Sequence, residues 1–178
     1  MKSLTTYITE KMVYNKANAS NYKYFPKTKE ELKELLDTLI EERGNEGDFN
    51  DIDTSEITDM SELFNDMDKF NGDISNWNVS NVKDMNNMFC YCRSFNKPLN
   101  NWDVSNVIDM HYMFYACNSF NQPLNYWDVS NVTDMAWMFA YCKLFNQPLN
   151  DWDVSNVKEN NLMFNECPIK RIYEPKFK

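Results

Sequence analysis

The chain has 178 residues, a formal net charge of −9 and a pI near 4.6. Apolar residues make up 43% of it and aromatic residues 15%, which is enough for a packed core and excludes a mostly disordered chain. The acidic balance excludes nucleic acid as the main partner, because binding to phosphates depends on clustered Lys and Arg. No apolar run reaches the roughly 18 residues of a membrane span.

Residues 1–27 predict an N-terminal segment apart from the main fold, which could serve as a docking or targeting leader. Ser3 can cap a helix there, and apolar residues recur at near-helical spacing: Leu4, Tyr7, Ile8, Met12 and Val13. The apolar stretch of about 7–15 residues that marks a secretory signal is missing. We therefore expect a protein that stays inside the cell or travels with a virion, and that reaches a cell surface only by a non-classical route.

Residues 28–44 predict the clearest helix. Thr28 and Glu31 form a capping box, and Gly44 suits the position just after the last turn. One face is apolar: Leu32, Leu35, Leu36, Leu39 and Ile40. A stack of repeats exposes the core of its first unit unless something covers it, so this helix is expected to be the N-terminal cap.

Residues 45–169 repeat with a period of 25 residues, and the copy at 45–69 is degenerate. The other four copies share a tryptophan at one position: Trp77, Trp102, Trp127 and Trp152. A fixed period of this length predicts a solenoid, here of about five coils, with the tryptophans in its core. Residues 170–178 are then a C-terminal tail or cap.

Two apolar patterns follow each other within a repeat. Residues 120–129 alternate apolar side chains with Pro and Asn, which predicts a very short strand flanked by turns, with Pro123 at its start. The second half has its apolar residues on a single helical face: Val132, Met135, Met138, Phe139 and Cys142. Asn131 can cap that helix, and Asp134 lies near its first N–H groups. We therefore expect an α/β repeat solenoid.

Cysteine occupies one position in four of the repeats, and Met67 holds that position in the first copy. The four are Cys92, Cys117, Cys142 and Cys167. A position that accepts Met for Cys predicts a small apolar core site with a free thiol. Coils about 5 Å apart would allow disulfides. Zinc would need ligands in short-range pairs, which only Cys90 and Cys92 approach, so no metal and no cofactor is expected.

These residues carry a resemblance. The pattern W-D-V-S-N-V-x-D-M-x-x-M-F, followed by F-N-x-P-L, resembles the 25-residue repeat of the BspA-like leucine-rich-repeat family over about 70% of the chain. That family is common in bacterial surface proteins and lipoproteins and is also carried by phages. The resemblance implies a right-handed stack of parallel coils with a role in protein binding or adhesion and no catalytic residues. The chain departs from the surface members by lacking a lipobox Cys and a wall anchor.

The extreme N-terminus carries a second, shorter resemblance. Met1-Lys2, Tyr7-Ile8 and Glu10 are similar to the capsid-targeting leader of tailed-phage internal head proteins, M-K-x-x-x-x-[FY]-I-x-E. In that family a prohead protease cuts after the Glu. The resemblance implies a phage-encoded virion structural protein or packaged cargo that uses the solenoid as an interaction scaffold. The alternative is a helix that packs on the cap.

Acidic residues recur in two columns. One holds Asp53, Asp103, Asp128 and Asp153, and the other holds Asp59, Asp84, Asp109, Asp134 and Glu159. Stacked carboxylates could gather Ca²⁺. Because the chain has only three glycines and lacks glycine-rich calcium loops, the favoured interpretation is that each Asp bonds its own turn or helix start.

Function in a repeat protein is expected where the repeats differ. Serine fills one column in every copy and His111 stands alone, so no catalytic group is predicted and the chain is not expected to be an enzyme. The variable columns place aromatic residues outside the predicted core: Tyr112, Trp137, Tyr126 and Tyr115, with Tyr91 and Tyr141 nearby. Such residues are typical binding anchors, which predicts a protein- or glycan-binding module. The alternative is that Tyr112 and Trp137 simply stack on each other across coils.

Overall fold

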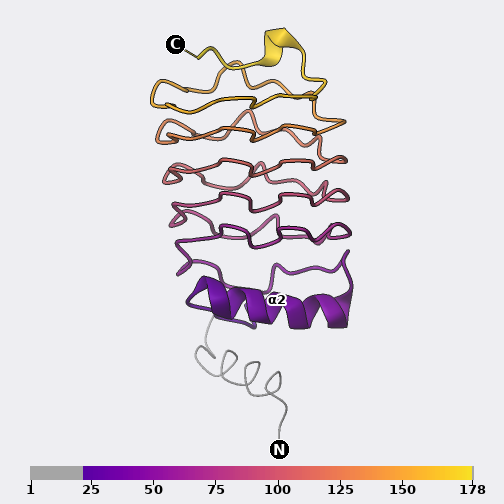
Figure 1. Ribbon diagram of the computed structural model, residues 1–178. Helices are drawn as coiled ribbons and strands as arrows, with labels where there is room; N and C mark the ends of the chain where they lie inside the picture. The colour runs from indigo at the N-terminus through magenta and orange to yellow at the C-terminus, as the bar shows by residue number, and fades with distance from the viewer. Residues whose placement is uncertain (1–21, 178) are drawn as a thin grey trace, which may run out of the picture.

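The computed structural model describes residues 22–177. Helix α2 spans Lys29–Arg43, and the short 3₁₀ helix η1 spans Arg171–Tyr173. Five coils of 25 residues lie between them, from coil one (45–69) to coil five (145–169). Figure 1 shows the coils stacked along one axis, with α2 across one end and η1 at the other. Within the described range no continuous strand forms, and neighbouring coils meet in isolated parallel bridges.

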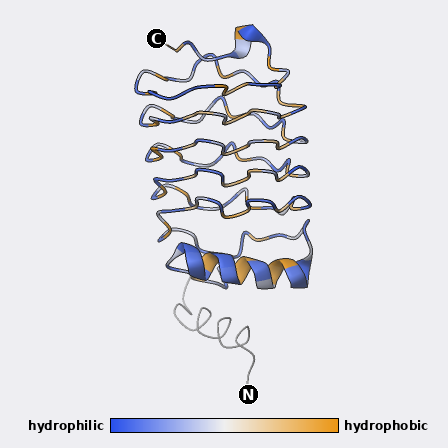
Figure 2. Cartoon of the chain, viewed as in Figure 1, coloured by the Kyte–Doolittle hydropathy of each residue, from blue (hydrophilic) through white to orange (hydrophobic). Residues whose placement is uncertain are grey.

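Helix α2 begins and ends where local sequence signals place it. The Thr28 hydroxyl accepts a hydrogen bond from the Glu31 N–H (3.3 Å), and Gly44, at a φ of 76°, donates its N–H to the Ile40 carbonyl (2.9 Å). The leucines of its apolar face are buried in one cluster with the core of coil one: Leu32, Leu35, Leu36 and Leu39. Figure 2 shows hydrophobic and hydrophilic residues alternating along α2. No helix within residues 22–177 is long and apolar enough to cross a membrane.

The second half of each coil carries a regular set of backbone hydrogen bonds, here called the ladder. Every other N–H donates to a carbonyl of the next coil. From coil three to coil four the four bonds are Met110 to Asp134 (3.0 Å), Tyr112 to Ala136 (3.0 Å), Phe114 to Met138 (2.9 Å) and Ala116 to Ala140 (2.8 Å). The equivalent four bonds join every neighbouring pair of coils, so the ladder runs through the whole stack.

The prediction of a helix in each repeat is wrong. The chain instead makes consecutive tight turns, such as the bond from the Met113 N–H to the Met110 carbonyl (3.2 Å). Tyr112 and Ala116 have φ values of 55° and 56°, which a right-handed helix cannot contain. Asn131 therefore caps no helix, and its side-chain amide donates to the Ser105 carbonyl of the previous coil (2.8 Å).

The predicted strand in the first half of each repeat is also wrong. In coil four this half holds only local turns, such as the bond from the Trp127 N–H to the Leu124 carbonyl (3.1 Å). Side chains join the coils here: Trp127 Nε1 donates to the Leu99 carbonyl (3.0 Å), and Asn121 Oδ1 accepts from the Asn146 N–H (3.0 Å). Side chains can replace a strand ladder at this point, where Pro123 has no N–H to give.

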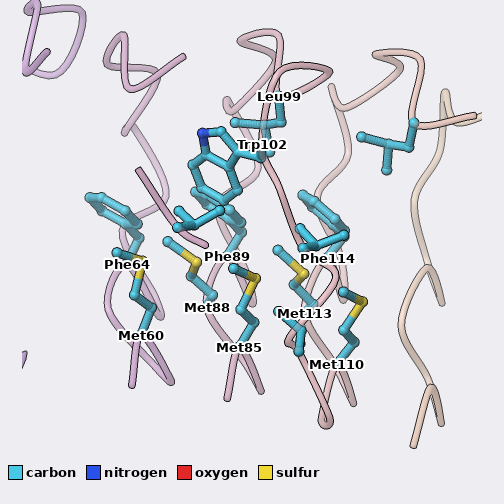
Figure 3. Packing of buried hydrophobic residues seen from close by; sticks show 14 of the residues in the cluster. Met60, Phe64, Met85, Met88, Phe89, Leu99, Trp102, Met110, Met113 and Phe114 are labelled. Atoms are coloured by element: carbon cyan, nitrogen blue, oxygen red, sulfur yellow. The ribbon is translucent and has the colours of Figure 1, made fainter. Parts of the chain in front are cut away.

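The core is a set of aromatic and sulfur-containing columns that run along the stack. Figure 3 shows Phe64, Phe89 and Phe114 in one row, and the Phe89 and Phe114 rings lie 5.4 Å apart at 7°. The four column tryptophans are 3–5% exposed: Trp77, Trp102, Trp127 and Trp152. Among the described residues all five cysteines are free thiols. Cys92, Cys117 and Cys142 are fully buried, whereas Cys167 is only partly buried, because the coil that would cover it is absent from the described residues.

Candidate binding surface

The ladder turns point aromatic side chains away from the core. In coil three Met110, Met113 and Phe114 point inward and are fully buried, while Tyr112 and Tyr115 remain partly exposed. We call the resulting surface the aromatic edge and define it as Tyr91, His111, Tyr112, Tyr115, Trp137 and Tyr141. It draws its residues from coils two, three and four, and the ladder holds their backbone in register.

Tyr115 is the centre of the aromatic edge. Its ring meets Tyr91 at 5.2 Å and Tyr141 at 5.4 Å, both edge to face, and it lies 5.2 Å from Tyr112 and 6.2 Å from Trp137. Burial, a hydrogen bond to Tyr91 and the neighbouring Tyr91 and Tyr141 raise the pKa of Tyr115 to about 12. The phenol is a neutral hydrogen-bonding group at physiological pH, as an ordinary tyrosine is, and it loses its proton only at a higher pH than an ordinary tyrosine does.

Tyr112 and Trp137 stack on each other, as the alternative interpretation of the sequence has it. Their ring centroids are 5.8 Å apart and their planes differ by 5°, and both side chains are partly exposed. The ring of His111 meets Tyr112 edge to face at 5.6 Å. Tyr112 and Trp137 thus pack on each other and still keep part of their surface exposed to solvent.

Two cations flank the aromatic edge, at positions that the sequence pattern did not single out. Arg93 lies 5.4 Å from the centre of the Tyr91 ring, and Lys143 lies 5.4 Å from the centre of the Tyr141 ring. Each is two positions after its tyrosine, in the same column of the repeat. This shared spacing is a sequence signal for a cation beside each tyrosine.

Tyr126 does not belong to the aromatic edge, although the sequence grouped it with Tyr112 and Trp137. It is 82% exposed and makes no ring contact with any residue between 22 and 177. It precedes Trp127 in the first half of coil four, whereas the ring cluster is built on the ladder half.

The acidic column beside the aromatic edge is used for turn formation, as favoured from sequence. Asp109 Oδ1 accepts from the N–H of His111 (2.9 Å), and Asp134 Oδ1 accepts from the N–H of Ala136 (2.8 Å). Asp128 does the same with the Ser130 N–H (3.0 Å) in the other column, and these bonds to Ser130 hold the pKa of Asp128 below its usual value. Each bond fixes a turn of its own coil.

Asp109, His111 and Asp134 are the one described group that could gather around a metal ion, with ligand atoms within 4.8 Å of one another. Carboxylate and imidazole ligands suit divalent transition metals. His111 Nδ1 already lies 2.7 Å from Asp109 Oδ1, so a metal at that nitrogen would have to break this contact. As they stand, Asp109 and His111 are bonded in the turn of coil three, and Asp134 is bonded to Ala136 in the turn of coil four.

A pocket of about 970 Å³ lies at the α2 end of the stack, and the sequence did not indicate it. Three of its charged groups interact: Arg43 binds both carboxylate oxygens of Asp51 (2.7 and 3.0 Å), and Lys23 approaches the same carboxylate at 3.3 Å. Asp48 also lines the pocket, and its Oδ1 accepts from the Asn50 N–H (2.8 Å). Burial raises the pKa of Asp51, but hydrogen bonds and charge from Arg43 and Lys23 outweigh it and hold that pKa below its usual value. The pocket is therefore built around a structural ion pair.

Comparison with known proteins relates the chain to a protein family. A family model described as Mycoplasma protein of unknown function, DUF285, matches residues 31–139 and again 98–171. The two overlapping matches agree with a repeated chain, and the family is related to BspA-like leucine-rich-repeat-type repeats. No curated protein and no solved structure matches the chain. Since the family model covers most of the chain, including most of α2 and all five coils, the protein belongs to the DUF285 family.

Proposed function

We propose that the protein is a non-catalytic binding module that holds a protein partner on the aromatic edge. The observation that supports this is the gathering of six ring side chains and two cations from three consecutive coils. Tyr, Trp and Arg are the residue types that most often dominate the energy of protein interfaces. A surface that is already ordered loses little conformational entropy on binding.

The charge next to the aromatic edge supports a partner with basic residues. Asp84, Asp109 and Asp134 follow one another along the stack in parallel bridges, and each begins the ladder half of its coil, which carries the edge residues. Tyrosine hydroxyls and the Trp137 indole N–H add polar groups to an otherwise apolar surface. Binding through such a surface weakens as salt rises.

A matched pair of variants tests the proposal. The double variant Tyr115→Ser/Tyr141→Ser removes the centre of the edge, and Tyr126→Ser removes an exposed tyrosine outside it. We expect Tyr126→Ser to keep a stability within about 1 kcal/mol of the wild type. The double variant loses the ring contacts of Tyr115, so its melting temperature is measured first and binding is compared at a temperature where all three proteins are folded. A partner captured by wild-type protein and by Tyr126→Ser should bind the double variant about 30-fold more weakly for each hot spot of about 2 kcal/mol. A partner retained equally by all three proteins would place the binding surface elsewhere.

A glycan partner is the competing outcome. The same three proteins can be applied to an array of immobilised glycans. Retention of a glycan that depends on Tyr115 and Tyr141 would replace the protein partner with a carbohydrate, because aromatic rings also stack on sugar faces. If glycan retention does not depend on these two residues, the proposal of a protein partner stands.

A second proposal, a phage virion protein or packaged cargo, is supported by Met1-Lys2, Tyr7-Ile8 and Glu10. These residues lie outside the described part of the chain. Cleavage after Glu10 predicts that protein extracted from virions begins at Lys11, which intact-mass measurement detects. Virion protein that still begins at Met1 would contradict targeting by such a leader.

We also propose that the coils wind in a right-handed sense, as in leucine-rich-repeat solenoids. The resemblance of the repeat motif supports this winding, and the parallel bridges between residues 25 apart support a stack of parallel coils. An experimental structure at side-chain resolution tests it directly, and a left-handed stack would contradict it.

A further inference from the structure

The ladder has a direction. In coils one to four every ladder N–H points toward the next coil, and the carbonyl that receives it belongs to the later coil. Sixteen such bonds, between 2.8 and 3.0 Å, join the five coils. Their peptide dipoles therefore add along the stack, as they do in a helix, with free carbonyls expected at the α2 end and free N–H groups at the other.

The ladder N–H groups of coil five have no following coil to accept their hydrogen bonds within the described residues. The N–H groups equivalent to those of the ladder belong to Asn160, Leu162, Phe164 and Glu166, and none of them has a hydrogen-bond acceptor within residues 22–177. The chain that follows covers the other half of the coil, where the Leu149 N–H donates to the Tyr173 carbonyl (2.8 Å). Figure 1 shows this final segment with η1 at the end of the stack. The ladder half of coil five is open.

The side chains of this half are also incompletely covered. Leu162 is 52% exposed. Phe164 is partly exposed, whereas Phe139, its equivalent in coil four, is fully buried. The two rings stack at 5.8 Å and 6°, so the column of phenylalanines continues to Phe164 and has no ring beyond it among the described residues. A further ring would extend the column at the spacing already present.

The opposite end of the stack is covered. Helix α2 lies across coil one, and Lys29 pairs with Asp59 (3.4 Å) at the end where the ladder carbonyls face outward. A second copy of the chain therefore cannot offer its carbonyl end without losing α2. Two open ends placed face to face would set donors against donors. An occupant of the open half has to bring carbonyl oxygens of its own.

We propose that the open ladder of coil five is a docking site for a polypeptide segment of a partner protein. The segment lies parallel to residues 159–166, accepts hydrogen bonds from the four free N–H groups with its carbonyls, and places an aromatic ring on Phe164. This is strand addition to an exposed edge, in which backbone bonds supply affinity and one side-chain position supplies selectivity. The site is separate from the aromatic edge and does not depend on it.

A peptide from the chain itself is the sharpest probe. A fluorescein-labelled peptide with the sequence of residues 130–144, carrying Ser in place of Cys142, contains the four carbonyls that accept from coil three and also contains Phe139. We expect saturable binding by fluorescence anisotropy, and none for a peptide of the same composition in scrambled order. Residue-resolved amide exchange should be fast at Asn160, Leu162, Phe164 and Glu166 in the free protein and slow when the peptide is bound.

Matched variants locate the binding. Leu162→Asp should weaken peptide binding about tenfold or more, because its carboxylate competes for the free N–H groups. Leu144→Asp makes the same change at a leucine of similar exposure, 58%, outside the ladder, and should leave binding within about twofold. Phe164→Ala removes only the ring. It should weaken binding of the labelled peptide and have little effect on the fold of coils one to four.

Three results would overturn the proposal. The four amides could exchange as slowly in the free chain as those of Met135, Trp137, Phe139 and Tyr141, which would mean that another part of this chain already covers them. They could exchange fast while the peptide fails to bind, which would mean that water alone satisfies them. They could become protected with rising protein concentration, which would make the occupant a second copy.

Discussion

The indole rings of Trp127 and Trp152 lie parallel, with centroids 6.5 Å apart and planes 3° apart. Each ring also donates its Nε1–H to the carbonyl of a leucine in the preceding coil, Leu99 or Leu124, at 3.0 Å. The tryptophan column therefore joins the coils by packing and by hydrogen bonds in the half that has no ladder. Neither contribution alone explains why a bulky aromatic residue recurs there in four coils.

Substitutions at Trp127 should separate these two contributions. Trp127→Ala should lower the free energy of unfolding by about 3–5 kcal/mol, the range for a large buried aromatic residue. Trp127→Phe keeps most of the packing but removes the indole hydrogen bond to the Leu99 carbonyl, which still accepts from the Trp102 N–H (3.1 Å), so the change should cost about 0.5–1.5 kcal/mol. Urea denaturation measures both, with Tyr126→Ala next to it as the exposed control. A Trp127→Phe protein as stable as the wild type would show that the hydrogen bond contributes nothing.

The left-handed backbone positions of the ladder turns predict a stabilising substitution. Glu62 is exposed and has a φ of 57°, a conformation that Asn and Gly adopt at lower cost than Glu. Glu62→Asn should therefore raise the free energy of unfolding by roughly 0.5–1 kcal/mol. Glu56→Asn makes the same change at an exposed residue whose φ is not positive and should bring no gain. If both changes raise the free energy of unfolding equally, the gain comes from the loss of a negative charge and not from the backbone conformation.

Local signals were sufficient for helix α2. The capping pair Thr28 and Glu31, the leucine face and Gly44 all act within a few residues of one another, so sequence spacing contains the information. The period of 25 residues likewise predicted a stack of coils and the burial of Trp102 and its equivalents.

The backbone within a repeat could not be predicted in the same way. Inward residues of coil three fall at Met110, Met113, Phe114 and Cys117, a spacing that a helix and a series of tight turns share. The bond that decides between them joins the Tyr112 N–H to Ala136, 24 residues later, and spacing does not reveal it. Bulky side chains at positive φ, such as Tyr112 and Trp137, also conceal a backbone that usually favours Gly or Asn.

The ion pair between Arg43 and Asp51 predicts a loss of stability in acid. The pKa of Asp51 is held below its ordinary value of 3.8, so the folded chain resists protonation more than the unfolded chain does. The contribution is present above about pH 4 and is lost as pH falls through the folded pKa. Asp51→Asn should cost about 1–3 kcal/mol at pH 7. It should also flatten the decline in the free energy of unfolding below about pH 4, whereas Asp37→Asn, exposed on α2, should change neither. If the free energy of unfolding of Asp51→Asn falls as steeply in acid as that of the wild type, Asp51 does not contribute to the loss of stability.

The thiols of the cysteine column predict that the free energy of unfolding also falls at high pH. Burial raises the pKa of Cys117 and Cys142 far above the ordinary value of 9.0, and burial with the nearby Glu174 raises that of Cys167 to about 11. The unfolded chain releases these protons above about pH 9 while the folded chain keeps them, so the free energy of unfolding should fall as pH rises from there. Cys117→Ala should flatten that fall, since it removes one of the perturbed thiols.

Alkylation checks the same pKa values one residue at a time. In the folded protein at pH 8 only about one thousandth of Cys167 is thiolate, against roughly a tenth in the unfolded chain. We therefore expect iodoacetamide to label Cys167 about 100-fold more slowly in the folded protein, with Cys117 and Cys142 unlabelled until the chain unfolds. Mass spectrometry of peptides from native and urea-treated samples measures each site. Rapid native labelling of Cys117 would show that the stack opens locally at coil three, because that thiol is fully buried beneath the neighbouring coils.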